Sequence, residues 1–550
     1  MCSRLDGGVT LKFEVPKPAN EPILNYAPGT ADRKAVVEEM QKVVATELDI
    51  PLVIGGREVR TGNRGVCRLP HDKDHLIGHY HKSGVKEADA AIRACLKARP
   101  AWANMPWEHR ASVMLKAAEL LARRYRHKAV AITMLVHSKN PYQAEIDIVE
   151  LVDFWRFNAY YAQQIYEDQP THSPPGVWNR MDYRPLEGFV FAVPPFNFIS
   201  IGGNLPTAPA LMGNVAIWKP ASSVVYSNYF IMRLLEEAGL PPGIINFLPG
   251  DSGVIGARIL KNKSLAGVHF TGSTSTLKTM YKVIGENIDG YSTYPRVVGE
   301  TGGKDFIFVH PSADVKAVEV AMLRGAFEYQ GQKCSAASRA YVPLSLWPRI
   351  REELLKDIKT VRMGPVTDPS AFMNAVIDQP AFDSIARYIG LAKASKKAEV
   401  VAGGGCDASK GYFIEPTVIR TRDPHSITME EEVFGPVLTV YVYKDKDLRK
   451  ALDLCNTTSP YALTGAVFAR DRDAIALAER RLRDAAGNFY INDKPTGATV
   501  GQQPFGGARA SGTNDKAGSV WNLIRWVSPR AIKENLDPPM DYRYPFMGKD

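Results

Sequence analysis

The sequence predicts an α/β protein with parallel, doubly wound sheets and two or three domains. A chain of 550 residues is longer than one hydrophobic core usually supports. Between residues 189 and 300, short apolar runs alternate with helical segments, and a second alternation starts at residue 306. Strand–helix alternation with short connections is typical of parallel sheets that are covered by helices.

The region before residue 165 is expected to be mostly helical. Helices are predicted at 31–48, 86–99, 107–124 and 143–163. A hairpin is predicted at 51–59, where two consecutive glycines form the turn. The last helix carries four acids, which we interpret as its solvated face. These acids are Glu145, Asp147, Glu150 and Asp153.

Residues 167–186 interrupt this pattern, because four prolines lie there among polar and aromatic residues. The segment is expected to leave the body of its domain in an extended form. It is either an edge hairpin that pairs with another subunit or a plain linker. The tail after residue 518, with two tryptophans and several prolines, is also expected to be extended.

The first alternating region supplies five predicted strands and four predicted helices. The strands are 189–193, 215–219, 244–248, 267–270 and 296–299. The helices are 203–212, 224–238, 252–260 and 273–284. Sheets of this type bind ligands at the carboxyl ends of their strands, and the ligand is often a dinucleotide. The usual glycine-rich fingerprint is absent, so a dinucleotide would need other residues.

A second α/β unit follows. Its predicted strands are 306–309, 340–342, 437–443 and 487–492, and the last of these ends in a glycine-containing loop at 495–499. Its predicted helices are 315–329, 348–361, 380–394 and 474–483.

Composition is that of an ordinary globular protein, with 45% hydrophobic and 23% charged residues. The net charge of +9 comes from scattered lysines and arginines, which argues against a nucleic-acid partner. Six cysteines without a C-x-x-C pair indicate reduced thiols, and no metal-binding cluster is present. Prolines interrupt the longest apolar region, at 189–218, so we expect no membrane span. Residues 1–10 do not resemble a secretory signal, and a mitochondrial presequence stays open.

One cysteine and one glutamate stand out as candidate reactive groups. Cys334 follows a predicted helix and is adjacent to Lys333. A cation or a helix end beside a thiol lowers its pKa and so activates it as a nucleophile. Glu300, at the end of a predicted strand, could activate water. The alternatives are a small buried cysteine and a carboxylate that pairs with Lys304.

Two strand ends could replace the missing dinucleotide fingerprint. Ser273 follows a strand and precedes a helix, where free N–H groups can hold a phosphate. Lys219 lies at another strand end, from which it could reach ribose hydroxyls. Taken alone, these residues are better explained as a helix cap and a surface lysine.

Six motifs in order resemble the aldehyde dehydrogenase superfamily, and the resemblance covers nearly the whole chain. They lie at 195–198, 218–220, 270–273, 299–304, 331–334 and 432–436. The resemblance implies an aldehyde dehydrogenase fold: a Rossmann-like NAD-binding domain, an α/β catalytic domain and a small β oligomerisation element. The NAD-binding domain is assigned to 1–164 and 189–300, the catalytic domain to 301–507, and the oligomerisation element to 165–188 and 508–550.

Within the superfamily the chain is most similar to the branch that oxidises glutamate 5-semialdehyde, which is in equilibrium with 1-pyrroline-5-carboxylate. The similarity lies at 195–205, 327–335, 487–492 and 501–512. It implies NAD as cofactor, formation of glutamate in proline breakdown, and a homodimer or larger homo-oligomer. The mitochondrial matrix is the expected location, with the cytoplasm as the alternative. The length is that of single-function eukaryotic members, without a proline dehydrogenase domain.

The resemblance also implies roles for the reactive residues. Cys334 attacks the aldehyde and later carries a thioacyl group, and Glu300 activates the water that releases the acid. The Asn197 amide and the Cys334 backbone N–H hold the oxyanion. An asparagine that only closes the preceding proline turn is the alternative for Asn197.

The cofactor and substrate residues follow from the same resemblance. Lys219 and Glu432 bind the two riboses, Ser273 binds the pyrophosphate, and Phe434 packs near the nicotinamide or, alternatively, belongs to the core. A second set binds the substrate, with the first three residues on its carboxylate and two aromatic rings around its aliphatic chain. This set is Ser335, Gly497, Ala498, Phe198 and Phe505.

Two rival functions stay open at this point. Some relatives have serine at position 498, so the alanine here removes one hydroxyl donor, worth about 1 kcal/mol. Another aldehyde, such as succinate semialdehyde or an aliphatic aldehyde, is disfavoured because an anchor of unpaired donors rejects substrates without the carboxylate. A catalytically silent binding protein on this fold is disfavoured because Cys334, Glu300 and Asn197 are all present.

Overall fold

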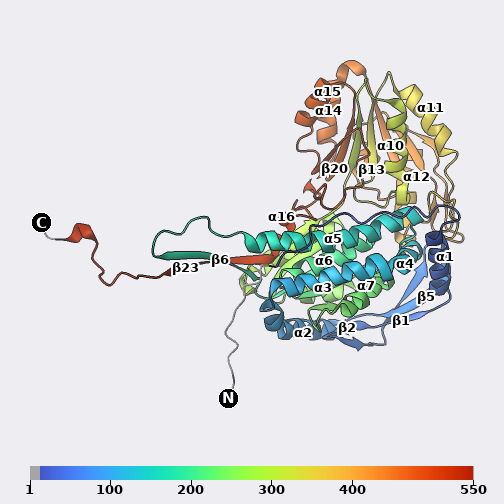
Figure 1. Ribbon diagram of the computed structural model, residues 1–550. Helices are drawn as coiled ribbons and strands as arrows, with labels where there is room; N and C mark the ends of the chain where they lie inside the picture. The colour runs from blue at the N-terminus through green and yellow to red at the C-terminus, as the bar shows by residue number, and fades with distance from the viewer. Residues whose placement is uncertain (1–12, 549–550) are drawn as a thin grey trace.

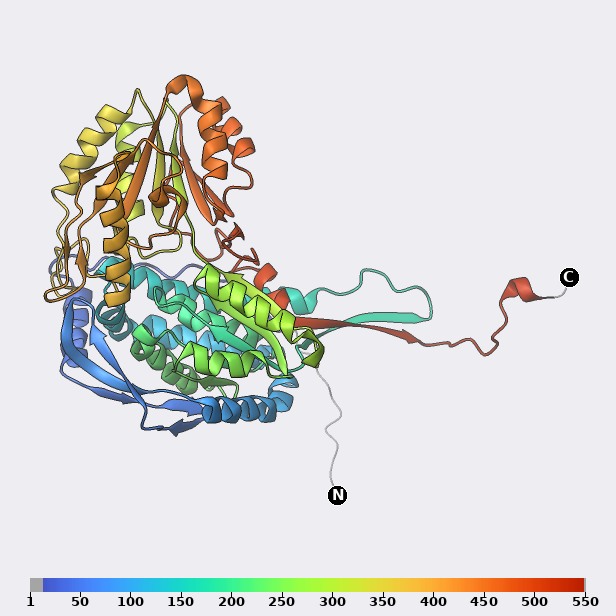
Figure 2. The same cartoon turned by 180° about the vertical axis from the view of Figure 1, so that it is seen from behind.

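The computed structural model describes residues 13–548, so the expectations about residues 1–10 concern a segment outside the described chain. Two lobes stand one above the other, each built on a sheet of seven strands (Figure 1). A two-stranded ribbon leaves the lower lobe and carries the C-terminal segment away from the body (Figures 1 and 2). The predicted α/β class is confirmed. The exact domain boundaries stay a prediction.

The sheet of the lower lobe has the order β11-β10-β7-β8-β9-β2-β3. Its strands are β2 (Leu52–Ile54), β3 (Arg57–Val59), β7 (Phe189–Val193), β8 (Ala216–Trp218), β9 (Ile245–Phe247), β10 (Leu265–Thr271) and β11 (Arg296–Glu300). Neighbours among β7 to β11 pair in parallel, and the hairpin β2–β3 adds an antiparallel edge. The five strands and the hairpin predicted for this sheet are confirmed.

Nine helices of the described chain belong to this lobe. They are α1 (Ala31–Val44), α2 (Val85–Ala103), α3 (Trp107–Glu119), α4 (Arg126–His137), α5 (Pro141–Glu167), α6 (Ile199–Leu211), α7 (Val225–Ala238), α8 (Ser252–Leu260) and α9 (Thr274–Glu286). The predicted helices are confirmed to within a few residues. The small sheet of β1 (Leu48–Ile50), β4 (Arg64–Leu69) and β5 (Asp72–His81) was not predicted.

The sheet of the upper lobe has the order β14-β17-β18-β13-β12-β20-β21. Its strands are β12 (Asp305–Val309), β13 (Ala337–Pro343), β14 (Ala398–Ala402), β17 (Thr417–Thr421), β18 (Val437–Tyr443), β20 (Thr464–Phe468) and β21 (Asn488–Ile491). The main helices are α10 (Val315–Phe327), α11 (Trp347–Ile358), α12 (Gln379–Ala394), α14 (Leu448–Thr457) and α15 (Arg472–Arg481). The four predicted strands are found, whereas β14, β17, β20 and α14 were missed.

The helix predicted at 315–329 ends early, at Phe327. A short 3-10 turn, η4 (Glu328–Gly331), follows, and Tyr329 and Gln330 adopt positive φ angles of 54° and 55°. The Gln330 amide donates to the carbonyl oxygens of Ser138 and Ala375, at 2.8 and 2.9 Å. The bond to Ser138 ties the turn before the cysteine to the lower lobe, and both bonds stabilise its unusual backbone.

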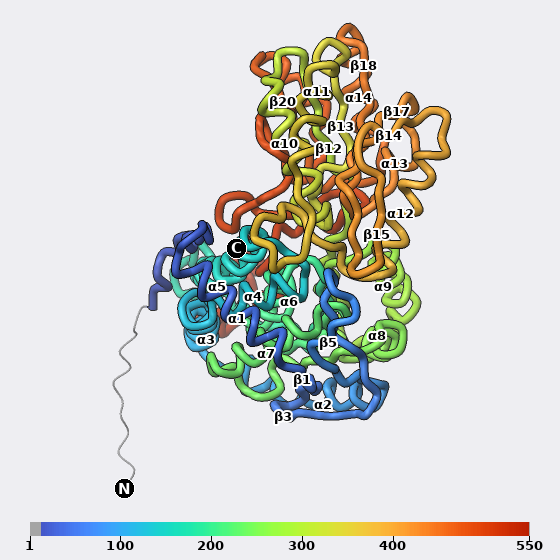
Figure 3. The backbone as a smooth tube through the Cα atoms, turned by 90° about the vertical axis from the view of Figure 1, so that its right-hand side faces the viewer, coloured from blue at the N-terminus to red at the C-terminus, as the bar shows by residue number. Residues whose placement is uncertain are grey.

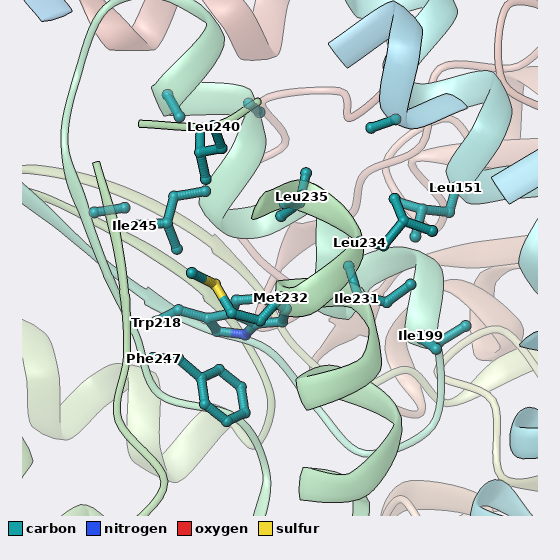
Figure 4. Close-up of a cluster of buried hydrophobic side chains, with 14 of the residues drawn as sticks. Leu151, Ile199, Trp218, Ile231, Met232, Leu234, Leu235, Leu240, Ile245 and Phe247 are labelled. Atoms are coloured by element: carbon teal, nitrogen blue, oxygen red, sulfur yellow. The ribbon is translucent and has the colours of Figure 1, made fainter. Parts of the chain in front are cut away.

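A buried aromatic pair fixes the end of β8. In Figure 4 the side chains of Trp218 and Phe247 lie beside Met232 of α7, and the two ring centroids are 5.2 Å apart. Trp218, Phe247 and Met232 are all almost fully buried. Because Trp218 is the last residue of β8, this packing determines where the next residue, Lys219, leaves the sheet.

The interpretation of the α5 acids as a solvated face is wrong. Glu145, Asp147 and Asp153 are fully or almost fully buried, and Glu150 is half-buried. Helix α5 lies at the upper side of the lower lobe, facing the upper lobe (Figures 1 and 3), so few of its faces reach solvent. Its acids are instead paired, and Asp147 accepts a hydrogen bond from the ammonium of Lys139 at 2.6 Å.

The segment at 167–186 is not a plain linker, because it contains a strand, and the predicted pairing with another subunit stays a prediction. Its strand β6 (Val177–Pro185) pairs antiparallel with β23 (Val527–Asn535), which is the tail of the same chain. The tail is extended, as predicted. Several large apolar side chains of this ribbon and tail are exposed. They are Trp178, Leu536, Met540, Tyr542, Tyr544 and Phe546.

We predict that replacing Lys139 with methionine destabilises the protein by about 3 kcal/mol, because removal of one partner leaves a buried charge unpaired. Asp147 would keep only the two backbone N–H groups of Ile199 and Ser200, each at 3.0 Å. The measurement is the midpoint of urea unfolding. The double variant that also carries Asp147→Asn should recover part of the loss.

The matched control is Lys397→Met, which removes an exposed ammonium from Asp423 at 2.9 Å. It should shift the midpoint far less, because solvent screens exposed pairs. Equal midpoints for the two single variants would contradict this account of α5.

Candidate active site

One cavity of about 250 Å³ collects most of the predicted reactive residues at the junction of the two lobes. Both Cys334 and Glu300 line it. Five residues of the predicted substrate set line it as well, namely Phe198, Ser335, Gly497, Ala498 and Phe505. Residues from α5, the end of β11, the turn after η4 and the loop after β21 thus meet around one space.

Cys334 lies in the turn between η4 and β13 and is partly exposed to the cavity. Burial raises the pKa of its thiol well above the ordinary value, and the carboxylates of Asp305 and Glu432 add to the effect. The Lys333 ammonium pairs with Glu328 at 3.1 Å. The Lys333 ammonium still attracts the thiolate, as expected, but burial and the surrounding carboxylates outweigh it, so the net shift of the thiol pKa is upward. Formation of the thiolate requires a proton acceptor.

Glu300 is the last residue of β11, and its carboxylate accepts a hydrogen bond from the backbone N–H of Gly507 at 3.0 Å. Burial raises the pKa of Glu300 well above 4.5, and the nearby Lys516 opposes that shift. Lys304 donates instead to the Ser338 hydroxyl at 2.6 Å. The alternative pairing of Glu300 with Lys304 is therefore wrong, and Glu300 remains a buried acid at the edge of the cavity.

Asn197 is buried and lies behind the cysteine turn rather than in the wall of the cavity. Its Nδ2 donates to the carbonyl oxygen of Gln332 at 3.1 Å, two residues before the cysteine. One amide N–H of Asn197 is used in this way, and a second remains. The contact fits a residue that holds the cysteine turn in place and leaves one donor for a developing oxyanion.

The substrate set surrounds the cysteine from two sides. The Ser335 hydroxyl donates to the Thr496 hydroxyl at 2.9 Å, which ties the cysteine turn to the loop at 496–500. Gly497 in that loop has φ of +99°, a conformation that favours glycine. On the opposite side, the Phe198 ring packs on the Lys139 ammonium, 4.1 Å from the ring centroid.

The predicted cofactor residues lie outside this cavity. Lys219 follows β8, and Ser273 follows β10 and caps α9 by accepting the Thr276 N–H at 3.2 Å. Glu432 and Phe434 come from the upper lobe, and Phe434 packs edge-to-face on Phe196 at 5.7 Å. Lys219 and Ser273 thus lie at strand ends of the lower sheet, and Glu432 and Phe434 lie in a loop of the upper lobe. Their positions outside the cavity suit a ligand other than the substrate.

These residues fit a bound dinucleotide. The Lys219 side chain is buried, burial lowers its pKa to about 8, and its ammonium has no hydrogen-bond partner within residues 13–548. Glu432 accepts only the Gly303 N–H, at 3.0 Å, and burial raises its pKa to about 7. The exposed Ser273 begins a thirteen-residue helix, where free N–H groups attract phosphate.

Sequence reasoning missed several polar residues of the site. Glu150 lines the cavity, accepts the Ser200 hydroxyl at 2.8 Å, and has its pKa raised by burial to about 7. The buried Lys139 and Tyr329 lie behind Phe198, with the Lys139 ammonium 4.4 Å from the centroid of the Tyr329 ring. A usable signal existed, since apolar residues surround the acids of α5 on every side and leave no solvated face.

No helix among residues 13–548 is long and apolar enough to cross a membrane. Within the same residues, no group of three or more histidine, cysteine, aspartate or glutamate side chains could hold a metal ion.

The sequence pattern of the "Aldehyde dehydrogenase family" matches residues 61–532. "Delta-1-pyrroline-5-carboxylate dehydrogenase, mitochondrial" of Dictyostelium discoideum is 51% identical over 98% of this chain and 97% of that protein. The human protein of the same name is 46% identical over 96% of this chain and 94% of its own length.

A crystal structure of the Mycobacterium tuberculosis delta-pyrroline-5-carboxylate dehydrogenase bound with NAD superimposes with a TM-score of 0.95. Its sequence is 50% identical, and the match covers 98% of this chain and all of the other. Fold, sequence pattern and close relatives agree. This chain belongs to the aldehyde dehydrogenase family.

Proposed function

We propose that this protein oxidises L-glutamate 5-semialdehyde, the open form of 1-pyrroline-5-carboxylate, to L-glutamate with NAD. The observation that carries the proposal is the single cavity that holds Cys334, Glu300 and the predicted carboxylate-binding loop. Its relatives in Dictyostelium, in human and in Mycobacterium tuberculosis are named for the pyrroline-5-carboxylate reaction, which supports the same conclusion.

The first step is attack of the Cys334 sulfur on the aldehyde carbon, which forms a thiohemiacetal. The thiol must lose its proton, and we assign its acceptance to Glu300, a partly buried carboxylate of the cavity whose raised pKa increases its affinity for a proton. The free N–H of Asn197 and the Cys334 backbone N–H stabilise the oxyanion. Lys219, Ser273, Glu432 and Phe434 would hold NAD, which when bound supplies the acceptor for hydride.

Loss of hydride leaves the acyl group on Cys334 as a thioester, and water must then release it. Glu300 is held by the Gly507 N–H at the cavity edge and acts here as the general base. Hydrolysis yields the carboxylate product and returns the thiol. One carboxylate thus serves both half-reactions.

The cavity recognises both the negative α-carboxylate and the positive α-amino group of the substrate. Ser335 and the backbone N–H groups of Gly497 and Ala498 bind the α-carboxylate. Glu150, across the cavity on α5, offers a carboxylate to the α-amino group. Phe198 and Phe505 pack on the aliphatic chain. Succinate semialdehyde lacks the amino group, and propanal lacks both charges.

We also propose a homodimer or larger assembly in the mitochondrial matrix. The ribbon of β6 and β23 projects from the body with exposed apolar side chains, which fits contact with a second copy. The relatives named above from Dictyostelium and human carry the word mitochondrial in their names.

We predict NADH formation from 1-pyrroline-5-carboxylate at a far higher kcat/KM than from propanal or succinate semialdehyde, because only the first substrate matches both charged ends of the cavity. Cys334→Ala should abolish turnover with all three. The control is Cys406→Ala, an exposed cysteine that does not line the cavity, which should retain full activity.

A higher kcat/KM with propanal or succinate semialdehyde would still support aldehyde oxidation by this protein, but it would overturn the assignment of the carboxylate-binding residues. Absence of turnover with every aldehyde, in folded protein that still binds NAD, would favour the silent binding protein instead.

We predict that Glu300→Gln lowers kcat by about 100-fold or more, the usual contribution of a general base. In the wild type, kcat should fall as the pH drops through a midpoint above 4.5, because the raised pKa of Glu300 leaves it protonated there. The Glu300→Gln variant should not show this fall of kcat at low pH, which is the acid limb of the profile. A pH profile of kcat measures both effects.

Glu415→Gln is the matched control, because Glu415 also accepts one backbone N–H, from Gly405 at 2.9 Å, but does not line the cavity. An unchanged acid limb in Glu300→Gln would show that another group is the base.

A further inference from the structure

We propose that residues 13–27, here called the N-terminal arm, are part of the substrate site and that Asn20 is the positioning residue of the carboxylate-binding loop. The inference deepens the proposed function and rests on it. The arm contains no helix or strand. It lies before the region that matches the family pattern, which begins at residue 61. Nothing in its sequence predicts a role at the cavity.

The arm runs along α5 between the two lobes before α1 begins (Figure 1). Its backbone is fixed to that helix, since the N–H groups of Glu21 and Leu24 donate to Asp153 and Glu145, each at 2.8 Å. The Glu21 carboxylate pairs with Arg156 at 2.7 Å. These bonds involve buried or half-buried groups, so the arm is seated on the body as firmly as a regular element.

Asn20 joins this seated arm to the loop at 496–500. Its Nδ2 donates both to the Asp153 carboxylate and to the Val500 carbonyl oxygen, each at 2.8 Å. Its Oδ1 accepts the Gln502 amide at 2.9 Å. All the donors and the acceptor of this amide are used in one bridge from α5 to the loop.

The loop is therefore held at both ends. Ser335 binds Thr496 at its start, next to the cysteine, and Asn20 binds Val500 at its end. Gly497 and Ala498, which carry the proposed N–H donors for the substrate carboxylate, lie between these two points. Glycine can adopt many backbone conformations, including the positive φ of Gly497, so an unattached loop would not keep its N–H groups in one direction, and the second attachment fixes them.

The arm also contributes directly to the wall of the cavity. Ile23 lines it together with Tyr142 and Ile146 of α5, although half of the Ile23 side chain is exposed, at 50%. A lining residue that is half-exposed lies at the open side of the cavity. The arm thus borders the entrance while its asparagine, three residues earlier, holds the loop.

The test is Asn20→Ala, assayed with 1-pyrroline-5-carboxylate and with propanal at saturating NAD. This substitution removes the hydrogen bonds of Asn20 to Val500, at the end of the loop, and to Gln502, just beyond it. We expect KM for 1-pyrroline-5-carboxylate to rise roughly five- to tenfold, with kcat and the propanal kcat/KM within about twofold of wild type. Gln502→Ala, which removes one of these bonds and leaves the arm intact, should give a smaller rise in the same KM.

The matched control is Asn25→Ala. Asn25 is an exposed asparagine of the same arm whose Oδ1 accepts only the N–H of Ala27, at 2.9 Å. It should leave both substrates unchanged. A merely structural role for Asn20 would lower the activities with both aldehydes together, and that result would overturn the proposal. An unchanged KM in Asn20→Ala would do the same.

Hydrogen exchange supplies a readout that does not depend on turnover. The N–H groups of Gln502 and Gln503 both donate to the Thr499 carbonyl at 3.0 Å. Their exchange should accelerate in Asn20→Ala and stay at the wild-type rate in Asn25→Ala. If exchange is faster in Asn20→Ala but the wild-type protein does not turn over 1-pyrroline-5-carboxylate, the attachment is upheld and the proposed function is overturned. Unchanged exchange would overturn the attachment itself.

Discussion

The buried contact between Lys139 and Asp147 is the interaction on which the site depends. Asp147 receives the N–H groups of Ile199 and Ser200 and so begins α6 immediately after Asn197 and Phe198. The Lys139 ammonium lies against the rings of both Phe198 and Tyr329, which belong to different lobes. A single desolvated pair therefore fixes the backbone that carries the oxyanion donor, one wall of the substrate cavity and the turn that leads to Cys334.

The reactive and substrate-binding residues come from segments that are far apart in the sequence and meet at the junction of the two lobes. Glu300 ends a strand of the lower sheet, Cys334 follows a helix of the upper lobe, and the carboxylate-binding loop follows the last strand of the upper sheet. None of these positions is reactive alone. Burial raises the pKa values of Cys334 and Glu300 together, so the thiol needs a base and the carboxylate has an increased affinity for a proton. The chemistry is thus a property of the junction between the lobes.

The sequence was sufficient for the elements whose patterns are local. The parallel strands from 189 to 300 and the end-of-strand residues Lys219 and Glu300 follow from alternating apolar runs. It was insufficient where partners are far apart in the chain. The apolar surroundings of the α5 acids indicate burial, but the sequence does not identify their partners, such as Asn20 and Arg126, which come from the arm and from α4. Likewise, the effect of Lys333 on the thiol depends on Glu328, which takes up its charge.

Covalent attachment of the substrate to Cys334 is the central claim, and it is tested most directly by mass spectrometry. Wild-type protein mixed with NAD and 1-pyrroline-5-carboxylate would be quenched in acid within the first turnover and digested. The account predicts that the peptide containing Cys334 carries the added mass of a glutamyl group, because the acyl group stays on the sulfur until Glu300 activates water for its release. An unmodified Cys334 peptide after NADH has formed, or an adduct on another cysteine such as Cys406, would contradict it.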